Sequence, residues 1–135
     1  MTQEHLSKTP FSQFNFEPAI QQGIESSGFS YCTPIQAESL PFALQGKDIA
    51  GQAQTGTGKT AAFVLATLHK LLSTPAKQTE KKQPRALMLA PTRELVIQIE
   101  KDAQQLAQFT DLKIGAVFGG TGYDKQQKMV EEGLD

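Results

Sequence analysis

The residues best suited to chemistry form a run of eight in the first half of the chain. Residues 53–60 have the sequence AQTGTGKT, which matches the P-loop pattern except that alanine stands in place of the first glycine. Glycines within such a loop let successive backbone amides point at a phosphate. The run predicts a nucleoside triphosphate site formed by Ala53, Gln54, Thr55, Gly56, Thr57, Gly58, Lys59 and Thr60. Lys59, which can reach the outer phosphates, and Thr60, whose hydroxyl can hold Mg²⁺, are the catalytic candidates.

A glutamine upstream of this loop could select the base of the nucleotide. Gln36 ends the run GFSYCTPIQ over residues 28–36, where Pro34 is expected to open a helix. Its side chain carries both a donor and an acceptor, which can pair with N6 and N7 of adenine. On these residues alone, the alternative is that Gln36 caps or decorates the start of the helix.

Two segments further along the chain could hold an anion. The run PTRE over residues 91–94 opens a predicted helix, with Thr92 as its N-cap and the acidic Glu94 favourable in the first turn. The exposed amides at such a helix start can bind an anion. Gly119 and Gly120 follow a predicted strand, and they either end it in a simple turn or allow a close approach to the backbone.

Together these segments resemble the Q motif, P-loop, motif Ia and double glycine of the DEAD-box ATP-dependent RNA helicases, in the family's order over residues 11–120. Phe11 lies seventeen residues before Gly28, as an isolated aromatic residue does in the family. The resemblance implies ATP rather than GTP, a hydrogen bond from Gln36 to adenine, and packing of Phe11 near the base. It also implies Mg²⁺ at Thr60, a structural role for Glu94, and RNA contacts from Pro91, Thr92, Arg93, Gly119 and Gly120.

A finer resemblance is carried by residues 51–60, 83–87 and 119–126, and it is to the bacterial helicase of the RNA degradosome. It implies RNA as a partner, single-stranded or in short duplexes, a role in RNA degradation, and a cytoplasmic location. It also implies RNase E and other degradosome components as protein partners. Two alternatives stay open, namely another P-loop NTPase such as a small-molecule kinase, and a non-enzymatic fragment or partner-binding module.

The predicted elements alternate between helix and strand. Apolar spacing and capping residues predict helices over 17–27, 34–44 (bent or broken at Pro41), 58–72, 93–109 and 123–132. Short apolar runs predict strands over 48–53, 86–90 and 113–118, and a polar surface loop covers 73–84. This order indicates an α/β fold with a parallel sheet flanked by helices. The resemblance specifies a RecA-like P-loop domain over 11–135, preceded by a flexible tail over 1–10.

Composition limits the remaining possibilities. The 135 residues suit one domain, and Lys and Arg nearly balance Asp and Glu, with a net charge of −1. RNA binding would therefore depend on a local site, because a dedicated electrostatic binder shows a basic excess. No apolar run is long enough to span a membrane. The single cysteine, Cys32, cannot form an internal disulfide and is predicted to be a packed thiol.

The acidic motif that names the resembled family, Asp-Glu-Ala-Asp, does not occur in these 135 residues. Neither do the family's Ser-Ala-Thr motif and second domain. We therefore expect a truncated first RecA-like domain that binds ATP weakly and does not turn it over, because phosphoryl transfer depends on charged groups from both domains. We also expect an exposed apolar sheet edge.

Overall fold

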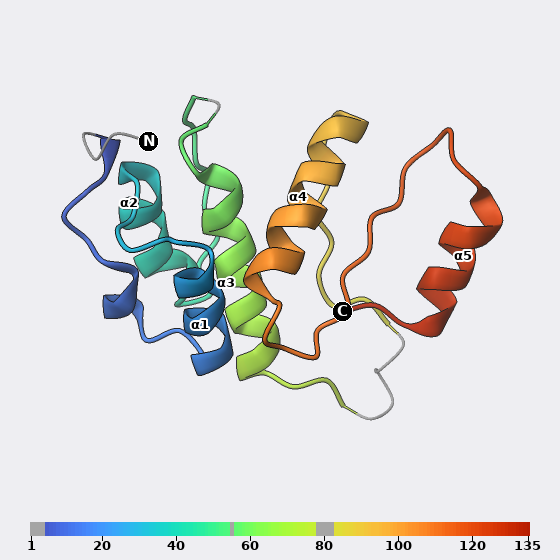
Figure 1. Ribbon diagram of the computed structural model, residues 1–135, viewed down its shortest axis with the longest axis horizontal. Coiled ribbons are helices and arrows are strands. Elements are labelled where there is room, and N and C mark those ends of the chain that lie inside the picture. The colour runs from blue at the N-terminus through green and yellow to red at the C-terminus, as the bar shows by residue number, and fades with distance from the viewer. Residues whose placement is uncertain (1–4, 55, 78–82) are drawn as a thin grey trace.

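A computed structural model describes residues 5–54, 56–77 and 83–135. This part of the chain contains a short 3-10 helix, η2 (Phe11–Phe14), followed by α1 (Pro18–Ser26), α2 (Pro34–Ala43), α3 (Lys59–Ser73), α4 (Arg93–Leu106) and α5 (Tyr123–Glu132). The five predicted helices are confirmed, with bounds that differ by at most three residues. Figure 1 shows α1 to α4 grouped together, while α5 stands apart beyond two non-helical segments.

The helix ends follow from their capping residues. Pro18 and Pro34 occupy the first turns of α1 and α2, where the missing amide costs no hydrogen bond. The Thr92 hydroxyl accepts a hydrogen bond from the Leu95 amide at 3.2 Å, which confirms Thr92 as the N-cap of α4. Gly28 follows α1 with a φ of +77°, as a left-handed C-terminal cap requires. Pro41 does not break α2, which continues for two residues beyond it to Ala43.

The structure differs from the prediction in the sheet. Within the described ranges no strand forms, and the β-type pairing that does occur is an isolated antiparallel bridge between Pro10 and Tyr31. The segments 48–53, 86–90 and 113–118 are therefore not strands of a ladder. Leu87 and Leu89 are 82 % and 87 % exposed, whereas Met88 and Ala90 pack against the core. One face of the apolar run is therefore open, although a parallel sheet would bury both faces.

Asp135 bridges the beginnings of two of these segments. Its main-chain oxygen accepts hydrogen bonds from the amides of Arg85 and Ala86 at 2.7 and 3.0 Å. Its own amide donates to the Lys113 carbonyl at 2.9 Å. At this point each segment therefore binds the backbone of Asp135 and not the backbone of the other segment.

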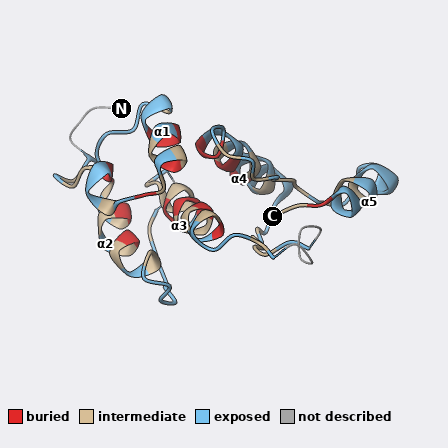
Figure 2. Cartoon of the chain, turned by 90° about the horizontal axis from the view of Figure 1, so that it is seen from below, coloured by how far each residue is buried: buried red, intermediate tan, exposed pale blue. Residues whose placement is uncertain are grey.

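The hydrophobic core lies between the helices α1, α2, α3 and α4. Figure 2 shows buried positions on the sides of these helices that face one another, whereas α5 has none. The apolar spacing of α3 predicts a buried face that includes Phe63, Leu65 and Leu68. Leu65 and Leu68 are buried, but Phe63 is 43 % exposed. The core cluster contains Phe11, Phe16, Ile20, Ile24, Cys32, Leu40, Val64, Leu65, Leu68, Ile99, Ala103, Leu106 and Ala107.

Helices α1 and α4 meet at a position where only glycine fits. A Cβ atom built on Gly23 would lie 2.1 Å from the carbonyl oxygen of Leu106 and 2.9 Å from its carbonyl carbon. Gly23 is buried, and its neighbour Ile24 is fully buried in the core. The close approach of the two backbones therefore depends on the absence of a side chain at this position.

The segment before η2 is attached to the chain that leads into α2. The Ser7 amide donates to the Cys32 carbonyl and the Cys32 amide donates to the Thr9 carbonyl, both at 2.8 Å. The predicted tail over 1–10 stays a prediction, since residues 1–4 lie outside the described residues. No helix in the described ranges is long and apolar enough to cross a membrane.

Cys32 is expected to resist thiol reagents in the folded protein. Its side chain is fully buried, and burial raises the pKa of the thiol to about 11. At pH 8 only about one molecule in a thousand would then carry the reactive thiolate. We expect a disulfide reagent such as DTNB to label Cys32 slowly under native conditions and rapidly in urea. Equal labelling rates in both conditions would contradict this packing.

Candidate nucleotide and RNA-binding site

The phosphate loop lies directly before α3, as the sequence predicts. Gly58 is the N-cap of this helix, with a φ of +83°, and Gly56 has a φ of +81°. No side chain of the described residues caps the start of α3, so its first amides and the positive end of its dipole are left for an anion. The described part of the loop therefore has the glycine conformations and free helix amides that phosphate binding would require. Thr55, also predicted to line it, lies outside the described residues.

In this structure the polar groups of the loop bind the loop's own backbone. The Lys59 ammonium group donates a hydrogen bond to the Ala53 carbonyl, and the Thr57 hydroxyl donates to the Gln54 carbonyl at 2.7 Å. A bound phosphate would compete with Ala53 for the Lys59 side chain. The Lys59 ammonium group therefore lies beside the first residue of the loop in which it is predicted to bind phosphate.

Gln36 connects the start of α2 to this loop. Its Oε1 accepts a hydrogen bond from the Thr33 amide at 2.9 Å, and its Nε2 donates to the Gly58 carbonyl at 3.1 Å. The side chain is only 5 % exposed. Capping of α2, the alternative suggested by the sequence, is therefore observed, and the residue predicted to read adenine also contacts the phosphate loop.

The Thr33 hydroxyl is an unsatisfied polar group beside the same loop. Its oxygen is buried and faces the Gln36 backbone amide in the capping box at the start of α2, but it makes no hydrogen bond of ordinary geometry with the described residues. It lies 3.2 Å from the point where a Cβ on Gly58 would sit. A buried hydroxyl without a partner is costly, and here it adjoins Gln36 and the N-terminus of α3. Thr33 is not among the residues predicted from the sequence, although threonine before Pro34 is a recognisable capping position.

Phe11, which the resemblance places near the base, and its neighbour Phe29 differ in exposure. Phe11 is only 2 % exposed and belongs to the core, while Phe29 is 43 % exposed. Their rings still lie close, with centroids 6.2 Å apart and planes tilted by 40°. The contact of Phe11 with a base therefore stays a prediction, and Phe29 is the more accessible of the pair.

A small hollow lies between the start of α2 and the phosphate loop. Its volume is about 240 Å³, and its walls are Pro34, Ile35, Glu38, Gln52, Ala53 and Thr57. A larger hollow of about 770 Å³ lies at Leu6, Ser7, Lys8, Gly28, Ser30 and Tyr31, and it contains none of the predicted site residues. The smaller hollow is the better nucleotide candidate because it includes two residues of the loop.

The predicted magnesium ligand is the hydroxyl of Thr60, in the first turn of α3. Mg²⁺ takes six oxygen ligands and usually keeps several waters when it binds with a nucleotide. The described residues contain no cluster of three or more His, Cys, Asp or Glu side chains able to hold a metal. Thr60 therefore fits Mg²⁺ only as one ligand among nucleotide phosphates and water.

The structure brings together the two segments predicted to bind RNA. The Arg93 Nη2 donates a hydrogen bond to the Gly119 carbonyl at 2.7 Å, and the guanidinium lies 5.5 Å from the ring centre of Phe118. Gly120 has a φ of +82°, and a Cβ there would lie 2.4 Å from Arg93 Nη2. The double glycine thus lies directly against the start of α4.

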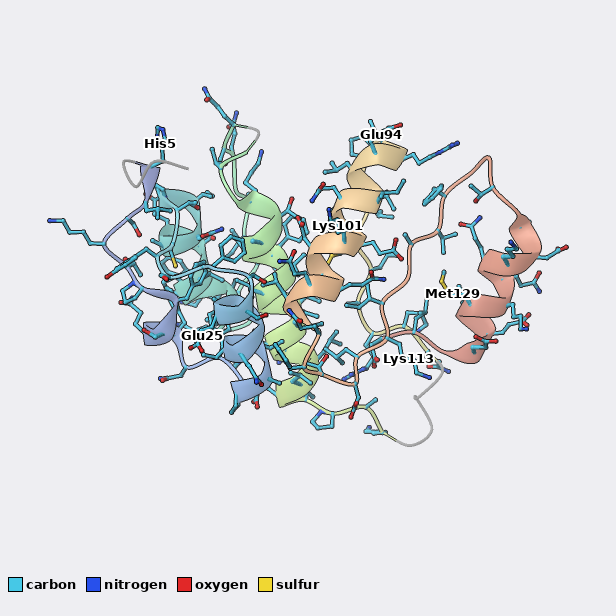
Figure 3. The ribbon with its side chains drawn as sticks, in the orientation of Figure 1. His5, Glu25, Glu94, Lys101, Lys113 and Met129 are labelled. Carbon is cyan, nitrogen blue, oxygen red and sulfur yellow. The ribbon has the colours of Figure 1, made fainter. Side chains whose placement is uncertain are left out.

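Free backbone amides surround this contact. Among the hydrogen bonds of the described residues, none is donated by the amides of Arg93, Glu94, Gly119 or Gly120. All four residues are exposed, and Figure 3 shows Glu94 at the tip of α4. Amides at a helix start and in a glycine turn, next to one guanidinium, are the kind of donors that can bind an anionic backbone.

The nucleotide and RNA candidates lie on the same side of the molecule. Figure 1 shows that α3 and α4 run side by side and that the phosphate loop and the start of α4 lie at the same end. The turn between the segment 113–118 and α5 lies at that end too. The core residues between α3 and α4 therefore connect the two candidate sites.

One polar residue of this region was not found from the sequence. The Gln126 side chain accepts a hydrogen bond from the Phe118 amide at 2.8 Å and donates one to the Phe118 carbonyl at 3.0 Å. No pattern of residue types marks such a pairing. The only sequence feature that could have suggested this contact is the glutamine itself, near the start of the helix that follows the double glycine.

The family model described as DEAD/DEAH box helicase matches residues 33–135. The chain is 56 % identical to the ATP-dependent RNA helicase RhlB of Serratia proteamaculans and 54 % identical to that of Yersinia pestis, over its full length in both cases. It spans 32 % of each of these relatives. The crystal structure of the RNA helicase Prp28 from Chaetomium thermophilum bound to ADP is similar over 90 % of this chain and 29 % of that one, with 34 % identity and a TM-score of 0.78.

Proposed function

Because this chain belongs to the DEAD/DEAH box helicase family, we propose that it provides the phosphate loop, the adenine-recognition residue and the first RNA contacts of an ATP-dependent RNA helicase. The observation that carries the proposal is the hydrogen bond from Gln36 to the Gly58 carbonyl. It joins the residue implied in base recognition to the loop implied in phosphate binding. Relatives that share more than half of its residues are RNA helicases by name.

In the proposed nucleotide site, the groups that bind ATP are released from contacts within the protein. Lys59 exchanges the Ala53 carbonyl for an outer phosphate, and the first amides of α3 donate hydrogen bonds to phosphate oxygens. Gln36 exchanges the Thr33 amide and the Gly58 carbonyl for N6 and N7 of adenine. Mg²⁺ bound at Thr60 would neutralise phosphate charge.

The proposed contribution of this chain is binding rather than turnover. Its residues can hold and orient ATP, but the Asp-Glu-Ala-Asp motif is not among the 135 residues. Transfer of a phosphoryl group needs charge stabilisation and a positioned nucleophile. We therefore expect nucleotide binding without measurable hydrolysis by these residues alone.

The proposed RNA site is the contact between α4 and the double glycine. Arg93 supplies a positive charge, and the amides of residues 93, 94, 119 and 120 supply neutral donors for phosphate oxygens. Such contacts position a nucleic acid without reading its sequence, which suits single-stranded RNA or a short duplex. The resemblance to the degradosome helicase extends the proposal to RNA degradation, with RNase E as a protein partner.

Replacing Gln36 with alanine is expected to remove the preference for ATP over GTP. A paired glutamine–adenine contact discriminates between bases by about 1–3 kcal/mol, so we expect ATP affinity to fall roughly tenfold and GTP affinity to change little. Titration of the chain with fluorescent ATP and GTP analogues measures both. Gln45→Ala, at an exposed position just after α2, is the matched control.

The same titration and a measurement of ATP hydrolysis with RNA present test the alternatives. In the titration, equal affinities of the unaltered chain for ATP and GTP would favour another P-loop NTPase. In the hydrolysis measurement, RNA-stimulated hydrolysis by the chain would show that its catalytic groups are not those named above.

A further inference from the structure

We propose that Gln126 is a positioning residue for RNA binding, because it fixes the turn that carries Gly119 and Gly120. The inference rests on the proposed RNA site. Gln126 lies on α5 and engages both polar backbone groups of Phe118, at 2.8 and 3.0 Å. Phe118 directly precedes the double glycine, so this pair of hydrogen bonds sets where the turn begins.

The side chain of Gln126 takes the place of a neighbouring strand at this point. A carboxamide offers an oxygen that accepts and an NH₂ group that donates, the same kinds of group that a paired residue in a sheet exchanges with its partner. Within the described residues the segment 113–118 has no partner strand. Gln126 therefore satisfies backbone groups that would otherwise be free to move or to bind water.

The turn is held from two sides. Arg93 binds the Gly119 carbonyl and lies over the ring of Phe118, while Gln126 binds the Phe118 backbone. The Thr121 hydroxyl adds a longer contact to the Phe118 carbonyl at 3.4 Å. Two helices thus clamp residues 118–121, and the amides of Gly119 and Gly120 stay exposed and without partners among the described residues.

A clamp of this kind matters most where the clamped residues are glycines. Glycine has the largest choice of backbone conformations, so a free double glycine would lose much entropy on binding a phosphate. A turn held in advance avoids that loss. Gln126 does not need to touch RNA for this effect, because it acts through the backbone of Phe118.

The neighbouring glutamine provides a matched control. Gln127 lies on the exposed side of α5 and binds Glu131 at 2.8 Å, one turn further along the same helix. Gln126→Ala and Gln127→Ala remove the same groups from adjacent positions. A third variant, Gly119→Ala, probes the close approach of RNA, since a Cβ on Gly119 would meet nothing within 4 Å in the free protein.

The test measures the affinity of the chain for a fluorescein-labelled oligouridylate at one fixed salt concentration. We expect Gln126→Ala to bind roughly fivefold to tenfold more weakly, the factor for one or two lost hydrogen bonds, and Gln127→Ala to match the unaltered chain. ATP affinity should not change in either variant. Gly119→Ala should cost less in the Gln126→Ala background than alone, because both changes act on one turn.

The outcomes separate this inference from the proposed function. If the unaltered chain does not bind the oligouridylate, the proposed RNA site fails and the role of Gln126 fails with it. If the unaltered chain binds but Gln126→Ala equals Gln127→Ala, only the role of Gln126 is overturned. Fully additive effects with Gly119→Ala, or loss of ATP binding in Gln126→Ala, would indicate a general structural role and would also overturn it.

Discussion

Replacing Lys59 with alanine is expected to abolish ATP binding by this chain at the concentrations where the unaltered chain binds. Hydrogen bonds to charged groups contribute about 1.5–3 kcal/mol each, and the Lys59 ammonium would meet more than one phosphate oxygen. We expect the dissociation constant to rise at least about tenfold to a hundredfold. Isothermal titration with ATP and Mg²⁺ measures the change.

The position of Lys59 distinguishes a local effect from a loss of folding. Lys59 is only partly exposed and binds the Ala53 carbonyl, so its removal frees one backbone group without opening the core. Lys70→Ala, at an exposed position near the end of the same helix, is the control and should bind ATP normally. In a longer protein that contains this segment, Lys59→Ala should abolish ATP-dependent unwinding, and unwinding that survives would remove the phosphate-loop assignment.

Replacing Gly23 with alanine is expected to cost the folded state about 2–3 kcal/mol, in the range for an overpacked core. Two effects oppose each other here. Alanine favours a helix over glycine by about 1 kcal/mol, but its Cβ would lie 2.1 Å from the Leu106 carbonyl oxygen. The collision dominates, because both partners belong to helix backbones and cannot rotate away as a side chain could.

Urea unfolding followed by circular dichroism measures this loss. Gln22→Ala, the preceding and exposed position of α1, gains helix propensity without a collision and should be within about 0.5 kcal/mol of the unaltered chain. A Gly23→Ala variant as stable as Gln22→Ala would show that α1 and α4 do not approach as closely as described.

The helices could be predicted because their signals are local. Pro18, Pro34 and Thr92 mark helix starts by their own chemistry, and the spacing of Ile99, Ala103 and Leu106 indicates a buried face. Phe63 shows the limit of this reasoning. Its spacing suited the core, but the orientation of α3 against its neighbours exposes it.

The strands could not be predicted with the same success because a strand depends on its partners. The run over 86–90 is apolar enough for a buried strand, yet Asp135 rather than another strand lies beside it. An apolar pattern indicates that a segment can form a strand if a partner strand lies beside it. It does not show whether that partner is present.

Parts of the candidate site could be predicted from residue types and their spacing. Contacts that depend only on the three-dimensional arrangement could not. The spacing of the glycines and Lys59 in the phosphate loop predicts phosphate binding. No such spacing predicts the contacts of Gln36 with Gly58 and of Gln126 with Phe118, because each joins an ordinary glutamine to a backbone group. The double role of Gln36, as cap and as candidate for base recognition, likewise became visible only in three dimensions.

Because α5 lies apart from the core, the phosphate loop and the double-glycine turn are expected to differ in their free energies of local unfolding. The phosphate loop leads into α3, which contributes Val64, Leu65 and Leu68 to the core, whereas no residue of α5 is buried. Figure 3 shows Met129 on the side of α5 toward the segment 113–118, where a Cβ on Gly115 would meet its sulfur at 2.6 Å. Segments with few buried apolar contacts open at lower free energy than the core. The double-glycine turn can therefore detach from Gln126 while the nucleotide half stays folded, so loss of the RNA half need not signal global unfolding.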